Sequence, residues 1–162
     1  CNICKAAAVE GGAKVHLASG AIGGFDVLQT VTLMAQAQQL EETAGIETHT
    51  GARGFRNTPV WAEHLLTDTE KTTVFTGNAK QAIATFPRRV NVAVATSLAT
   101  TGPESTGVTM HSVPGWVGDD HCITAEIEGV KAVVDICSST SAIAGWSAVS
   151  LLRNLSSPVC FY

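Results

Sequence analysis

Residues 123–136 of this sequence read ITAEIEGVKAVVDI. Polar and apolar side chains alternate over 123–128, and 132–136 is almost continuously apolar, which are both patterns of β-strands. The pair Glu128-Gly129 stands between these runs and predicts a hairpin turn. A further apolar run, Val108–Val113, precedes them. The sequence therefore predicts three consecutive strands that end in an antiparallel pair.

Upstream of these strands the pattern changes to that of helices, with two shorter strands between them. Pro87 predicts the end of one helix, because proline disfavours helical geometry in the residue before it. The predicted helices are Ile22 to about Gln39, Ala79–Phe86, Val90–Thr100 and Ser141–Leu152, and the additional strands are Lys14–Ala18 and Glu47–Thr50. This order predicts an α+β fold, in which a mixed, largely antiparallel sheet carries these helices on one face.

Composition limits the classes of partner. The chain has 162 residues, of which 45% are hydrophobic, and a formal charge of −4. This is enough for one domain with a core, while the mild acidity and the lack of a Lys/Arg cluster argue against binding to nucleic acid or to an anionic membrane. No apolar run reaches the length of a membrane span, and no signal segment is visible, so we expect a cytoplasmic protein.

Five cysteines are an odd number for a chain that builds its own core, so a disulfide scaffold is not expected. Cys1 and Cys4 form a C-x-x-C motif without a second pair at zinc spacing. Reduced thiols on a helix from Cys4 to Glu10 are favoured over a metal or redox site. The sequence thus predicts no metal.

Two segments could bind a ligand or be purely structural. Residues 19–26 read SGAIGGFD and lead from a predicted strand into a helix, an arrangement that offers free backbone N–H groups to an anion. Their glycine spacing does not match the dinucleotide fingerprint. A plain tight turn remains the alternative here. The hydroxyl-rich run Ser138–Ser141 either caps the last helix or contacts a ligand.

His121 is the histidine whose surroundings best suit proton transfer. It follows the glycine-rich approach Pro114–Asp120, which ends in two carboxylates, and it opens a predicted strand. The carboxylates would raise the pKa of the imidazole and burial would lower it, so the two together can set it near neutrality. A solvated loop of glycines and acids is the alternative.

Several of these motifs together resemble a known family. In chain order, the matching residues are Ser19–Asp26, Phe75-x-Gly77-x-Ala79, Phe86-Pro87-x-x-Val90-Asn91-Val92-Ala93, His121-x-Ile123, Glu126-x-Glu128-Gly129 and Thr140-Ser141-Ala142. They resemble the carboxyl-terminal domain of L-aspartate dehydrogenases, over about Lys14 to Asn154.

This resemblance implies an NAD- or NADP-dependent oxidative deamination of L-aspartate to iminoaspartate, and then to oxaloacetate and ammonia. It also implies an amino-acid substrate, a likeness to the second domain of two-domain dehydrogenases, and a homodimer. We expect the dimer to use the strands between Val108 and Ile136. His121 matches the catalytic histidine of the family, with the role of general acid/base.

The remaining site residues follow from the same resemblance and from the chemistry of a dicarboxylate. The substrate-binding candidates are Ser19, Gly20, Ala21, Gly23, Arg53 and Asn91, and the cofactor-binding candidates are Asn91 and Ala93. Arg53 is included because a guanidinium is the strongest single partner for a carboxylate. The sequence departs from the family where Asp119 and Asp120 stand in place of an Asn before the histidine.

We expect residues 1–18 to be the tail of an otherwise absent Rossmann domain, 19–154 the substrate domain and 155–162 a carboxyl-terminal tail. A chain without a cofactor domain is not expected to transfer hydride alone. Two other functions fit the same residues. One is a non-catalytic remnant or interaction module, and the other is a dehydrogenase for a different amino or 2-oxo acid.

Overall fold

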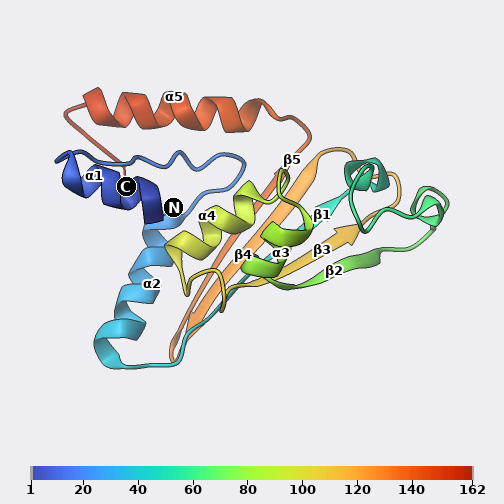
Figure 1. The fold of residues 1–162 in the computed structure, drawn as a ribbon, viewed down its shortest axis with the longest axis horizontal. Helices are drawn as coiled ribbons and strands as arrows, with labels where there is room; N and C mark the ends of the chain where they lie inside the picture. The colour runs from blue at the N-terminus through green and yellow to red at the C-terminus, as the bar shows by residue number, and fades with distance from the viewer. Residues whose placement is uncertain (1, 162) are drawn as a thin grey trace.

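The computed structural model describes residues 2–161. Its helices are α1 (Asn2–Glu10), α2 (Phe25–Gln38), α3 (Ala79–Thr85), α4 (Asn91–Ala99) and α5 (Ala142–Ser156). Its strands are β1 (Thr43–Thr50), β2 (Thr72–Asn78), β3 (Gly107–Ser112), β4 (Asp119–Ile127) and β5 (Val130–Ser138), and short 3-10 helices cover Ala52–Phe55 and Glu63–Leu66. Figure 1 shows their arrangement.

The strands form a mixed sheet in the order β2-β3-β1-β4-β5. β1 runs parallel to β3, and the other neighbouring pairs are antiparallel. The α+β prediction is confirmed, including the β4–β5 hairpin. Gly129 in its turn has a φ of +80°, a conformation that glycine adopts without steric cost.

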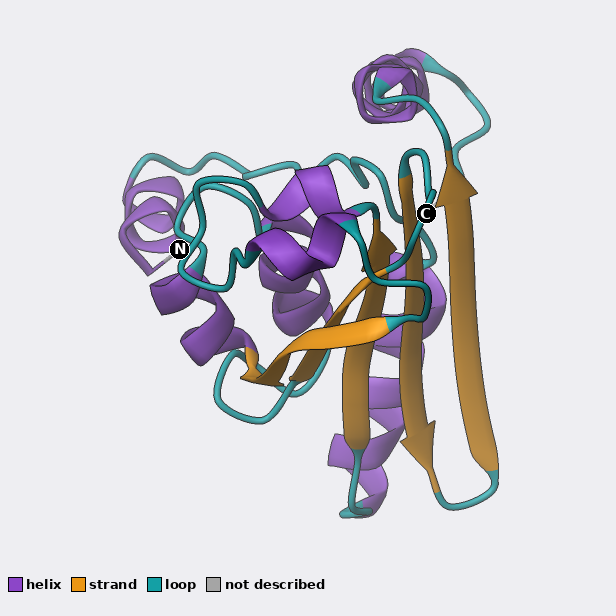
Figure 2. Cartoon of the chain, turned by 90° about the vertical axis from the view of Figure 1, so that its right-hand side faces the viewer, coloured by secondary structure: helices purple, strands orange, loops and turns teal. Residues whose placement is uncertain are grey.

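The core lies between one face of this sheet and the helices α2, α3 and α4 (Figure 2). Alternation along β4 turns Ile123 and Ala125 toward the helices, where both are fully buried. Leu28 and Val31 of α2 pack against them in the same buried cluster. The predicted cover by the helices near 79–86 and 90–100 is therefore found.

The last helix does not cover the sheet, contrary to the prediction for Ser141–Leu152. α5 lies beyond the end of β5 (Figures 1 and 2), and none of its described side chains is buried. Trp146 and Leu152 are each about two-thirds exposed. The apolar pattern correctly predicted a helix here, but it did not predict where the helix packs. The helix α2 already covers the face of the sheet at β4 and β5.

Two strand assignments also need correction. Residues 14–18 are extended but form no strand, and Val15 and Leu17 are each more than half exposed, so their alternation reflects no buried face. Conversely, residues 72–78 form the edge strand β2, where we predicted only a lead into the next helix. Gly77 and a register shift between Thr73 and Phe75 break the alternation that would have predicted this strand.

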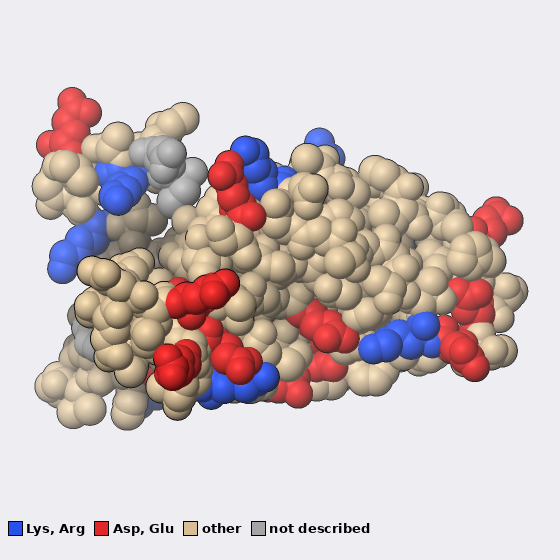
Figure 3. Space-filling view, turned by 90° about the horizontal axis from the view of Figure 1, so that it is seen from below, with Lys and Arg blue, Asp and Glu red and all other residues tan. Residues whose placement is uncertain are grey.

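Within residues 2–161, no helix is both long and apolar enough to cross a membrane. On the face seen in Figure 3, Lys and Arg side chains are scattered, and several of them lie beside Asp and Glu side chains. The C-x-x-C motif includes Cys1, which lies outside the described residues.

Candidate functional site

A cavity of about 540 Å³ opens between the helix-facing side of β1 and β4, the start of α4 and the segment that leads into α5. Its walls include His121, Arg89, Asn91, Ala21 and residues 138–141. These groups come from four separate parts of the sequence. The fold therefore gathers a base, a cation and hydroxyl groups around one space.

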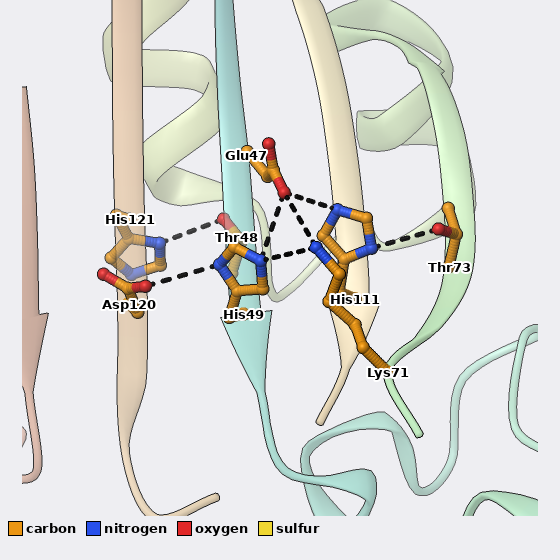
Figure 4. Close-up of polar contacts among 8 residues, drawn as sticks. All are labelled: Glu47, Thr48, His49, Lys71, Thr73, His111, Asp120 and His121. Atoms are coloured by element: carbon orange, nitrogen blue, oxygen red, sulfur yellow. Dashed lines mark hydrogen bonds and ion pairs between the residues drawn. The ribbon is translucent and has the colours of Figure 1, made fainter. Parts of the chain in front are cut away.

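His121 lies on the helix-facing side of β4, opposite Thr48 of β1. Its Nδ1 atom is 3.0 Å from the Thr48 hydroxyl oxygen (Figure 4), and the residue is only 6% exposed. Burial lowers the pKa of His121, and Asp119 and Asp120 act in the opposite direction without cancelling it. The imidazole is consequently neutral near pH 7. If Nδ1 donates its proton to Thr48, Nε2 is free to accept a proton from a ligand.

Arg89 is the cation of the cavity. It lies between Pro87 and the first residue of α4, and its guanidinium donates a hydrogen bond to the carbonyl oxygen of Gly54. The residue before the helix, Val90, has no side-chain acceptor, so the first-turn N–H groups of α4 are not capped by it. This corner of the cavity suits a carboxylate.

The hydroxyl-rich segment makes local hydrogen bonds at the start of α5 and lines the cavity, although Ser141, the residue before the helix, makes no side-chain cap. Thr140 accepts a hydrogen bond at Oγ1 from the Ala142 N–H at 3.2 Å, and Ser138 donates from Oγ to the Thr140 carbonyl oxygen at 2.8 Å. Ser139, Thr140 and Ser141 also line the cavity. Gly118 makes this approach possible, because its φ is +89° and a Cβ there would collide with the Ser138 backbone.

The structure brings together only some of the predicted site residues. His121, Ala21, Asn91 and Ala93 line the cavity. Ser19, Gly20 and Gly23 line neighbouring hollows instead, and the Gly20 N–H donates to Ser147 Oγ at 2.9 Å. The turn itself packs on β5, since Gly23 approaches Ile136, the cross-strand partner of His121.

Arg53 does not line the cavity within the described residues, whereas Arg89 does. Arg89 was not among the site residues that the sequence analysis selected. One signal was present, because Arg89 lies inside the Phe86-Pro87-x-x-Val90-Asn91 motif. Which of the two arginines lines the cavity could be determined only from the fold.

A comparison with protein families matches residues 28–155 to the family described as "Aspartate dehydrogenase, C-terminal". The chain belongs to this family. The resemblance that the sequence motifs predicted is thereby confirmed, and with it an aspartate dehydrogenase domain of the oxidoreductase class.

Individual relatives agree with this assignment. The chain is 33% identical to L-aspartate dehydrogenase of Methanosarcina acetivorans over 162 residues, which cover 94% of this chain and 58% of the relative. It is 37% identical to L-aspartate dehydrogenase of Cupriavidus taiwanensis over 127 residues, which cover 75% of this chain and 44% of the relative. The chain thus spans about half the length of the relatives that it matches.

The fold comparison gives the same result. The crystal structure of aspartate dehydrogenase from Thermotoga maritima superposes with a TM-score of 0.74 at 29% sequence identity. The match covers 93% of this chain and 57% of that protein.

Proposed function

We propose that this domain supplies the substrate side of the active site of an L-aspartate dehydrogenase that uses NAD or NADP. The observation that carries the proposal is the shared cavity of His121 and Arg89, which combines a neutral imidazole with a cation for a carboxylate. Membership of the aspartate dehydrogenase family supports the substrate class.

In this proposal Arg89 and the first turn of α4 bind a substrate carboxylate, and the hydroxyl groups of residues 138–141 contact the rest of the molecule. His121 Nε2 accepts a proton from the substrate amine, or from the water that attacks the imine carbon. Thr48 holds the ring through Nδ1. The water supplies the oxygen of oxaloacetate, and ammonia leaves.

NAD or NADP, when bound, accepts the hydride from the substrate Cα. Asn91 and Ala93 would hold the nicotinamide end. Both line the cavity, Asn91 also lines an adjoining hollow, and the small side chain of Ala93 leaves space beside His121. The residues therefore fit a cofactor that reaches the cavity from the α4 side.

The proposal includes a cytoplasmic homodimer that uses the strands between Val108 and Ile136. The helices α2, α3 and α4 cover one face of the sheet, and this leaves the opposite face of those strands for a second copy. Sedimentation at micromolar concentration tests the dimer, and a monomer would contradict it.

The direct test of the site is a titration of the chain with L-aspartate, observed through the NMR signals of the histidine rings. We expect the His121 signals, assigned with His121→Gln, to shift on addition of L-aspartate and to stay unchanged with L-lysine. In a full-length enzyme that carries this domain, His121→Ala should lower kcat about 10²- to 10⁴-fold while cofactor affinity changes little. Near-normal turnover by His121→Ala would show that His121 is not the general acid/base. If the unsubstituted enzyme turned over another amino acid but not L-aspartate, the proposed substrate would be wrong.

A further inference from the structure

The face of the sheet that α2, α3 and α4 leave open carries a cluster of imidazole and carboxylate groups. Glu47 and His49 lie two residues apart on β1, and alternation turns both away from Thr48 and the His121 cavity. The parallel register of β1 and β3 places His111 beside His49. The two rings stack with their centroids 4.8 Å apart (Figure 4).

Three possible metal ligands converge in this cluster. Glu47 Oε1 is 3.1 Å from His49 Nε2 and 2.8 Å from His111 Nε2. Ligand atoms of Glu47, His49 and His111 all lie within 4.8 Å of one another. In a tetrahedral zinc site, ligands about 2.1 Å from the metal lie about 3.4 Å apart. Both distances from Glu47 are shorter than this spacing, so its carboxylate must move away from the two rings to admit an ion.

A positive charge already occupies this position. The Lys71 ammonium is 3.5 Å from Glu47 Oε1 and 3.3 Å from His49 Nε2. The Lys71 side chain is half exposed, so it can turn into solvent without breaking the core. Two of the three ligands, Glu47 and His49, thus contact a cation that is not rigidly held.

A hydroxyl group orients the His111 ring from behind, as in many metal sites, and a carboxylate lies near the His49 ring. His111 Nδ1 is 3.0 Å from Thr73 Oγ1, and His49 Nδ1 is 3.4 Å from Asp120 Oδ2. His49 Nδ1 is buried and has no hydrogen-bond partner among the described residues. Burial and the charge of Lys71 also lower the pKa of His111, against the effect of Glu47, which leaves that ring in the neutral form that binds metals.

We propose that Glu47, His49 and His111 form a binding site for a divalent transition-metal ion, Zn²⁺ in the first instance, which displaces the Lys71 ammonium. Two imidazoles and one carboxylate are a known zinc ligand set, and they disfavour Mg²⁺ and Ca²⁺, which prefer oxygen ligands. A fourth position remains for water. The site lies on the opposite face of the sheet from His121, which is the face that the proposed homodimer would use, so a second copy would pack over it. It does not depend on the proposed dehydrogenase activity.

The test measures Zn²⁺ binding to the whole chain by calorimetry, in a Cys1→Ser/Cys4→Ser background that removes the C-x-x-C motif. We expect one ion per chain. Glu47→Gln and His49→Gln should each weaken binding at least about tenfold, since each removes one ligand. His64→Gln, which changes an exposed histidine paired with Asp68, is the matched control and should leave binding unchanged.

Two further measurements distinguish a metal site from a network of ion pairs. Lys71→Met should tighten Zn²⁺ binding because it removes the competing cation, whereas Lys131→Met, which changes a lysine paired with Glu126, should not. Co²⁺ bound in place of Zn²⁺ should give the visible absorption of a four-coordinate site without a thiolate band, which excludes Cys122 as a ligand.

Weaker zinc binding in Lys71→Met would overturn the proposal, as would equal affinity in the parent chain, Glu47→Gln and His49→Gln. Circular dichroism spectra verify that each variant is folded. Glu47 is almost half exposed, so its change to glutamine should not affect folding. His111 is buried, and for that reason it is not used as the primary variant.

Discussion

His121 and Thr48 face each other across β4 and β1, with the imidazole Nδ1 3.0 Å from the threonine hydroxyl oxygen. This contact fixes the ring on the cavity side of the sheet. Thr48→Val keeps the shape of the side chain and removes the hydroxyl. In a full-length enzyme we expect kcat to fall about fivefold, the effect of losing one hydrogen bond of about 1 kcal/mol.

Thr48→Ser is the control for this change, because it restores the hydroxyl group. It should recover most of the lost kcat. If Thr48→Val and Thr48→Ser have the same kcat, the hydroxyl does not position His121. The pH profile of kcat should also change in Thr48→Val, which a purely structural role would not cause.

The free energy of unfolding should decrease as the pH is lowered below 6.5, before most carboxylates become protonated. The pKa of His121 in the folded chain lies below its ordinary value of 6.5, because the buried ring resists protonation. Full stability is therefore present above pH 6.5 and declines as the pH falls toward the pKa of the folded state. Urea unfolding between pH 7.5 and about pH 5, in the presence of EDTA, measures this slope.

His121→Gln should make this slope shallower, although His111, whose pKa is also lowered, still contributes. His64→Gln should leave it unchanged, because His64 is exposed. An identical slope in the parent chain and His121→Gln would contradict the prediction. Glu47, Asp68 and Glu104 do not interfere, since their pKa values lie below the ordinary values for carboxyl groups. Burial and Asp135 raise the pKa of Asp120, so its contribution opposes that of His121 at the acidic end of this range.

The two arginines near the cavity should differ in their effect on substrate binding. Arg89→Met removes the cation from the cavity wall, and we expect the KM for L-aspartate to rise at least about tenfold, since charged hydrogen bonds contribute about 1.5–3 kcal/mol. Arg53→Met is the matched control and should change KM by less than about twofold. A larger increase in KM for Arg53→Met than for Arg89→Met would show that Arg53 binds the substrate carboxylate.

Gly118 should be the glycine near the site that tolerates an alanine least. It combines a φ of +89° with close contact to the Ser138 backbone, whereas Gly129 has a φ of +80° and open space around it. Gly129→Ala therefore adds backbone strain of about 1 kcal/mol, and Gly118→Ala adds a collision to a similar strain. Urea midpoints of the two variants measure the difference, and equal destabilisation would show that Ser138 moves away at no cost.

The sequence predicted the elements whose pattern is local. The β4–β5 hairpin could be predicted because alternation and Gly129 mark it within fourteen residues. β2 was missed because it is an irregular edge strand with Gly77 in it. The position of α5 depends on which helix packs against β5, and the sequence of the helix alone does not contain that information.

The same limit applies to the candidate site. His121 could be singled out from its neighbours in the chain, but Arg89 becomes part of the cavity only when the start of α4 packs beside β1. The cluster on the open face was equally hidden. Glu47 and His49 share a strand face by alternation, yet His111 joins them only through the parallel pairing of β1 with β3.

Consecutive residues of β1 belong to different sites on opposite faces of the sheet. Thr48 contacts His121 at the cavity, while Glu47 and His49 belong to the cluster on the open face. A single insertion or deletion between Thr43 and Glu47 would slip the strand by one residue and exchange the two faces. The His49 imidazole would then face the core, and the Thr48 side chain would lie on the open face. This short segment should therefore accept substitutions at each position much more readily than any change in its length.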